Sequence, residues 1–141
     1  GNVSYEVELS ESTILQEIKT SLPKRTVVPR EFDKDLENYL QTHPFVKKDF
    51  SLSQMSFDLK MPERFLSSYF NKDLEKTFGE WKNDLRIEYA CQLIEEGNAK
   101  KITIEAISAD AGFVSRSKFI DAFKARKGVT PSAYIKEKVD A

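Results

Sequence analysis

The chain has 141 residues, of which 40% are hydrophobic, 32% are charged and only ten are glycine or proline, five of each. This length allows one domain or two small lobes, and the composition favours a soluble helical protein over a disordered chain. One Cys and one His exclude an internal disulfide and a zinc site built from several soft ligands. The net charge of −1 argues against a protein that coats nucleic acid through overall positive charge.

The sequence contains neither an apolar run of about 18 residues nor a signal-peptide pattern. This predicts a cytoplasmic chain without membrane contact. Residues 1–30 end in "SLPKRTVVPR" and hold one predicted short helix, around "ESTILQEIKT". We interpret this segment as a linker, or as the end of an upstream domain. Because the chain begins with Gly and not Met, a sensor or dimerisation domain, or a membrane segment, is expected before it.

A domain is predicted over residues 31–141. Apolar residues recur at helical spacing from residue 31 until Pro44 interrupts them. Ser51, followed by Gln54, has the pattern of a capping box and opens a short helix. A second helix runs through "ERFLSSYFNKDL", so residues 51–74 are predicted to form a first helix-turn-helix.

A longer helix is predicted over residues 78–96, and Gly97 is expected to end it in a left-handed conformation. Its apolar residues cover more than one side, which is typical of a helix packed between two lobes. Residues 103–127 are predicted to form a second helix-turn-helix, with Thr103 and Ser115 as caps. Thr130, followed by proline, opens a last short helix.

The two helix-turn-helix segments repeat each other when the sequence is shifted by about 52 residues. The matched positions are caps or apolar residues: Ser51 with Thr103, Met55 with Ile107, Leu66 with Phe119, Phe70 with Phe123, Thr77 with Thr130 and Trp81 with Tyr134. The predicted fold class is therefore all-α, with two helix-turn-helix subdomains joined by a long linker helix.

Two stretches carry a resemblance to a known family. The segment "AGFVSRSKFIDAFKARKGVTPSAY" (111–134) resembles the signature of AraC-type (AraC/XylS) transcription regulators, and "LRIEYACQLI" is similar to their linker helix. The resemblance covers about residues 31–139 and implies a homeodomain-like C-terminal domain of about seven helices. It also implies a bacterial regulator that binds double-stranded promoter DNA with two recognition helices in successive major grooves, and that contacts RNA polymerase.

The length of the predicted linker helix agrees with this mechanism. A helix of about 19 residues is about 28 Å long, and one helical turn of DNA is about 34 Å. The linker could therefore hold two reading helices roughly one turn of duplex apart.

Side chains that read bases must lie on the outward face near the start of each second helix. The predicted base-reading residues are Arg64, Ser67, Ser68, Arg116, Ser117, Ile120 and Asp121. Arg116 leads this set, because a guanidinium can bond guanine O6 and N7 together. Asp121 stands where related proteins often carry arginine; it repels phosphate but can accept a hydrogen bond from cytosine N4.

Phosphate contacts are expected from basic side chains and from free amides at helix starts. The predicted phosphate-binding residues are Ser51, Asn71, Ser115, Lys118, Lys124, Arg126, Lys127 and Thr130. The alternative for Arg64 and Arg116 is that each is solvated or touches phosphate alone.

A different class of function remains open. The acidic pI of about 6.0 and Asp121 are also compatible with a helical protein-interaction module that has lost DNA binding. An enzyme is not expected, since no nucleophile, base or metal cluster is evident, and no cofactor is predicted.

Overall fold

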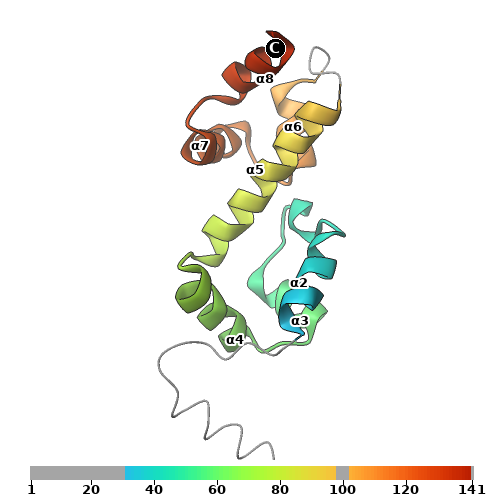
Figure 1. The fold of residues 1–141 in the computed structure, drawn as a ribbon, viewed down its shortest axis with the longest axis vertical. Helices are drawn as coiled ribbons and strands as arrows, with labels where there is room; N and C mark the ends of the chain where they lie inside the picture. Colours follow the sequence, from blue (N-terminus) through green and yellow to red (C-terminus); the bar gives the residue numbers. More distant parts are fainter. Residues whose placement is uncertain (1–30, 98–101, 141) are drawn as a thin grey trace, which may run out of the picture.

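A computed structural model describes residues 31–97 and 102–140 (Figure 1). In these two ranges the regular structure is helical throughout, with seven α-helices, a 3₁₀ turn (η1) and a π-helical turn (η2). Their bounds are α2 Phe32–Leu40, η1 Pro44–Val46, α3 Leu52–Leu59, α4 Glu63–Ser68, η2 Tyr69–Leu74, α5 Phe78–Glu96, α6 Ile104–Asp110, α7 Arg116–Lys127 and α8 Pro131–Asp140. The all-α prediction is confirmed. The predicted linker 1–30, with its short helix, lies outside the described residues.

Two lobes pack on opposite ends of α5, which runs diagonally between them in Figure 1. The first lobe buries side chains from α2, α3, α4 and η2 against Trp81, near the start of α5. The second buries side chains from α6 and α7 against the later turns of α5, from Ile87 to Ile94. The apolar residues of α5 face two cores in succession, which explains why they cover more than one side of the helix.

The helix caps repeat as the sequence repeats. At four helix starts that match in pairs across the repeat, a hydroxyl accepts a hydrogen bond from the backbone amide three residues further on, which satisfies an amide that has no partner within the helix. These caps are Ser51 (3.1 Å), Thr77 (3.0 Å), Thr103 (3.0 Å) and Thr130 (3.1 Å). The duplicated unit therefore extends past each helix-turn-helix: α3, α4 and the start of α5 correspond to α6, α7 and α8.

The expected capping box at Ser51 is only half formed. The side-chain amide of Gln54 donates to Asp58 at 2.8 Å instead of returning to the backbone of Ser51. The complete box lies at the start of α5, where the Glu80 carboxylate accepts from the Thr77 amide at 2.9 Å.

The prediction for Gly97 is wrong. Its backbone is extended, with φ −94°, whereas the left-handed glycine stands after α7 at Gly128, with φ 80°. A Cβ on Gly97 would lie 2.9 Å from the backbone carbonyl oxygen of Leu93 and 2.8 Å from Cδ1 of Ile102. Glycine is required at this position by close packing and not by a left-handed turn.

The helix predicted through "ERFLSSYFNKDL" changes character midway. It is α-helical as far as Ser68 and continues as the π turn η2, which is followed by Glu75 with φ 56°. The change keeps Leu66 and Phe70 buried, at 0% and 1% exposure, and leaves Asn71 exposed to solvent. π-helical turns are rare and recur at functional sites.

The two lobes also touch each other directly. Gly112, in the turn of the second helix-turn-helix, lies so close to the first lobe that a Cβ would stand 2.6 Å from the carbonyl oxygen of Val46. Beside it, the buried guanidinium of Arg86 on α5 donates to the carbonyls of Phe45 (2.6 Å) and Lys47 (2.8 Å). The same guanidinium lies 5.5 Å from the ring centroid of Phe113. These contacts fix the orientation of the second lobe against the first.

Candidate nucleic-acid interface

The first helix-turn-helix consists of α3, a short turn and α4. The turn begins at Lys60, in a left-handed conformation with φ 57°, and the Ser56 hydroxyl donates to the carbonyl of Met61. Pro62 precedes α4 with extended backbone and offers no side-chain cap. Leu66 faces the core, so the outer surface at the start of α4 is formed by exposed Arg64 and its neighbours.

The second helix-turn-helix consists of α6, the turn from Ala111 to Ser115, and α7. The Ser115 hydroxyl caps α7 by accepting from the Lys118 amide at 3.1 Å. Phe119 and Phe123 are fully buried. The opposite face of α7 is polar and exposed along Arg116, Ser117, Lys118, Asp121 and Lys124.

The predicted base-reading residues differ in their access to solvent. Four are exposed: Arg64, Arg116, Ser117 and Asp121. Ser67 and Ser68 are half-buried, and Ile120 is half-buried against the core of the second lobe. The outward positions are thus mainly polar, and Ile120 has less free surface than the sequence suggested.

Arg116 is engaged in an ion pair that the sequence did not indicate. Its Nη1 lies 2.6 Å from a carboxylate oxygen of Glu105 on α6, with both side chains more than half exposed. Exposed ion pairs contribute about 0 to 1 kcal/mol. Glu105 can therefore orient the guanidinium while leaving it free to exchange this carboxylate for another acceptor.

The predicted phosphate-binding residues fall into two groups. Lys118 and Lys124 project from α7 into solvent. Arg126 and Lys127 instead turn back to α5, where both lie within 3.0 Å of the Glu88 carboxylate.

The ion pairs of Arg126 continue toward the first lobe. Arg126 also lies 3.5 Å from Asp84, which in turn pairs with Lys76 in the loop between η2 and α5. Burial alone would raise the pKa of Glu88, but the hydrogen bonds from Lys127 and Arg126 outweigh it and hold this pKa below its usual value. The network fastens the C-terminal end of α7 to the linker helix.

The remaining predicted phosphate positions lie at helix starts and on η2. The hydroxyls of Ser51, Ser115 and Thr130 are each occupied by an amide of their own helix. What these starts can offer an anion is the remaining first-turn amides and the positive end of the helix dipole. Asn71 is exposed on η2.

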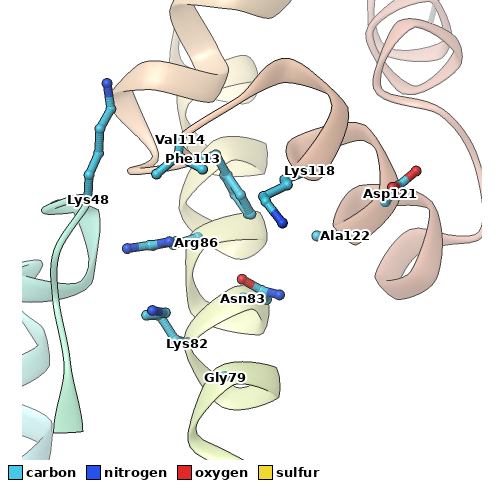
Figure 2. Close-up of a pocket in the computed structure, with 10 residues that line it drawn as sticks. All are labelled: Lys48, Gly79, Lys82, Asn83, Arg86, Phe113, Val114, Lys118, Asp121 and Ala122. Carbon is cyan, nitrogen blue, oxygen red and sulfur yellow. The ribbon is translucent and has the colours of Figure 1, made fainter.

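A cleft between the lobes was not anticipated from the sequence. It has a volume of about 570 Å³ and is lined by residues from α5, from α7 with its preceding turn, and from the loop at Lys48 (Figure 2). Lys48 and Lys82 are far apart in the chain, so local sequence patterns could not bring them together.

The described ranges lack two kinds of feature. No helix among residues 31–97 and 102–140 is long and apolar enough to cross a membrane. In the same residues no group of three or more His, Cys, Asp or Glu side chains is placed to hold a metal ion.

The comparison with protein families decides the classification. A family model described as a helix-turn-helix domain matches residues 55–137, which is more than half of the chain. This chain belongs to the AraC-type helix-turn-helix family. It is accordingly a DNA-binding domain of the transcription-regulator type and not an enzyme.

Solved structures of the same fold agree with the family assignment. The C-terminal domain of AraT, a response regulator from Geobacillus stearothermophilus, is 24% identical over 77% of this chain and 86% of its own, with a TM-score of 0.63. A DNA-binding transcriptional dual regulator from Escherichia coli K-12 is 20% identical over 76% and 91% of the two chains, with a TM-score of 0.64.

A third similar structure is the C-terminal domain of the two-component response regulator yesN from Fusobacterium nucleatum. It is 25% identical over 73% of this chain and 97% of its own, with a TM-score of 0.60. No curated protein matches the chain significantly.

Proposed function

We propose that this AraC-type domain recognises a specific double-stranded promoter sequence by placing α4 and α7 in successive major grooves. The observation that carries the proposal is the pair of matched helix-turn-helix units at the two ends of one rigid helix, each with a polar outer surface at the start of its second helix (Figure 1). The direct contacts between the lobes support it further, because two reading helices need a fixed separation to bind together.

The regulatory setting belongs to the same proposal. Two of the similar structures are C-terminal domains of response regulators. By analogy, a sensor or dimerisation domain joined to the N-terminal side would control binding, and contact with RNA polymerase would alter transcription. The domain would then act in the cytoplasm, where bacterial DNA lies.

Selection of bound duplexes from a random pool tests the central claim. The expected result is a consensus with two half-sites about one helical turn apart. Affinity for the selected duplex should fall steeply with salt, with a log-log slope of about −0.9 per neutralised phosphate. A selection that yields no consensus, together with absent duplex binding at low salt, would favour the protein-interaction module instead.

Arg116→Ala is expected to abolish the preference at one or two base pairs of the selected site. The guanidinium is exposed and held only by a surface ion pair, and a bidentate contact to guanine provides about 1 to 3 kcal/mol of discrimination. The measurement is the affinity for the consensus and for each single-base variant. An equal loss on every duplex would show that Arg116 binds phosphate.

The basic residues of α7 should contribute differently to the salt dependence of DNA binding, according to whether they already form ion pairs within the protein. Lys124→Gln is expected to reduce the salt slope by about 0.9, because Lys124 is exposed on the polar face. Arg126→Gln serves as the matched comparison: it should change the slope less, since Asp84 and Glu88 already pair with Arg126. Equal slopes in the two variants would contradict this division.

A further inference from the structure

Figure 2 shows a cleft between the two lobes that gathers positive charge from three separate parts of the chain. Lys48 comes from the loop before α3, Lys82 and Arg86 from the first half of α5, and Lys118 from the first turn of α7. Among the ten residues that line the cleft, Asp121 is the one acid. Four cations against one carboxylate make this an electropositive hollow in a chain whose net charge is −1.

The four cationic side chains of the cleft differ in the interactions that they already make within the protein. Arg86 is buried, and its Nε and Nη2 donate to the backbone carbonyls of Phe45 and Lys47. Lys82 donates to the carbonyl of Phe50 at 3.2 Å and lies over the ring of Phe78. Lys48 and Lys118 are exposed and form no ion pair within the described ranges. Apart from Asp121, no carboxylate among residues 31–97 and 102–140 lines the cleft to balance this positive charge.

The environment of Lys82 favours the binding of an anion. Burial, and then repulsion from Arg86, lower the pKa of Lys82. A bound anion would offset both effects, because it would interact favourably with the two cations at once. Asn83, which also lines the cleft, adds an amide that can donate to an anionic oxygen.

The place of the cleft identifies the anion. Lys118 and Asp121 line it and also belong to the exposed face of α7 for which base reading is proposed. If α4 and α7 entered successive major grooves of one duplex, the sugar–phosphate backbone of that duplex would cross the gap between the lobes. Phosphodiester groups are therefore the anions that this gap would meet.

We infer that the interlobe cleft binds the DNA backbone between the two half-sites, through Lys48, Lys82, Asn83 and Lys118. The inference rests on the proposed function and adds to it three residues for which the sequence predicted no role. Such contacts fix the register of the protein on the duplex and carry no sequence information directly.

A substitution at Gly79 tests the inference without removing any of the proposed DNA-contacting side chains. Gly79 lines the cleft near the start of α5, and a Cβ at this position would have only the Thr77 hydroxyl oxygen within 4 Å, at 3.9 Å. Gly79→Glu should fold normally, since glutamate is a better helix former than glycine. It should weaken binding to the selected duplex by about tenfold or more at low salt, because a negative charge then faces the phosphates. Gly79→Gln is the neutral control and should bind nearly as tightly as the wild type.

Replacing the lysines with neutral residues tests the same contacts by removing positive charge, whereas Gly79→Glu adds negative charge. Lys48→Gln and Lys82→Gln should each weaken binding to the selected duplex and to a scrambled duplex by a similar factor, and each should reduce the salt slope by about 0.9. Lys34→Gln, an exposed change on α2 away from the cleft, should leave both unchanged. Methylphosphonate linkages placed one at a time between the half-sites should weaken binding of the wild type more than binding of Lys48→Gln.

The outcomes separate the two proposals. If the wild type binds its selected duplex with the expected salt dependence but Gly79→Glu and both glutamine variants bind equally well, the cleft does not hold the backbone. Binding of inorganic phosphate in the cleft, without any effect of these variants on DNA affinity, would also overturn the inference. Failure of the wild type to bind any duplex would refute the proposed function first.

Discussion

Gly112→Ala is expected to destabilise the protein by about 3 kcal/mol or more, because two costs combine at this residue. The backbone of Gly112 has φ 97°, which L-residues rarely adopt. The added methyl group would also meet the backbone of Val46, with its carbonyl oxygen at 2.6 Å. Since Val46 belongs to the first lobe, the second lobe would have to move away from it.

The change should lower the melting temperature by roughly 10 °C, as measured by thermal unfolding followed by circular dichroism. Gly128→Ala is the matched control: its φ is 80°, but a Cβ there would meet nothing within 4 Å. It should therefore show only the conformational cost, about 1 kcal/mol. Equal losses in the two variants would mean that contact with Val46 contributes nothing.

Arg86→Met is expected to cost about 2 to 4 kcal/mol of folding free energy. The guanidinium is 4% exposed and donates to the carbonyls of Phe45 and Lys47. Methionine can fill much of the same space but leaves both carbonyl oxygens without this donor. It also removes the cation from the ring of Phe113 in the second lobe.

Denaturant unfolding measures this effect, with Arg64→Met as the control. Arg64 is exposed on α4, so its replacement should change stability by less than about 0.5 kcal/mol. In DNA binding the two variants should differ again. Arg86→Met should tolerate a change of one base pair between half-sites better than the wild type does, because the lobes are held less firmly. Unchanged stability and spacing preference in Arg86→Met would refute the role assigned to this residue.

Both variants act where the two lobes meet. Gly112 and Arg86 hold the lobes together on one side of α5, and the chain of ion pairs from Lys76 through Asp84 to Arg126 links them on another. The ion pairs are partly exposed and contribute little individually. The packed contacts of Gly112 and Arg86 should therefore dominate the fixed spacing of α4 and α7.

The sequence by itself determined the helical class, the helix starts and most of the core. Caps act over three residues and helical periodicity over three or four, so Thr103, Ser115 and Thr130 could be assigned without the tertiary structure. The burial of Phe119 and Phe123 likewise followed from their spacing of four. The internal repeat extended these local signals to the relation between the two helix-turn-helix units.

Only the tertiary structure decided which charges are free and how the lobes meet. Arg126 and Lys127 are predicted phosphate ligands, and α5 places Glu88 against both, 38 or more residues away in the chain, so that neither charge is unpaired. Gly97 looked like a left-handed cap, but its backbone is extended and its lack of a side chain makes room for Ile102. The cleft unites Lys48, Lys82 and Lys118 from three segments. Electrostatic and packing contacts depend on distance in space, and local sequence patterns do not encode that distance for residues so far apart in the chain.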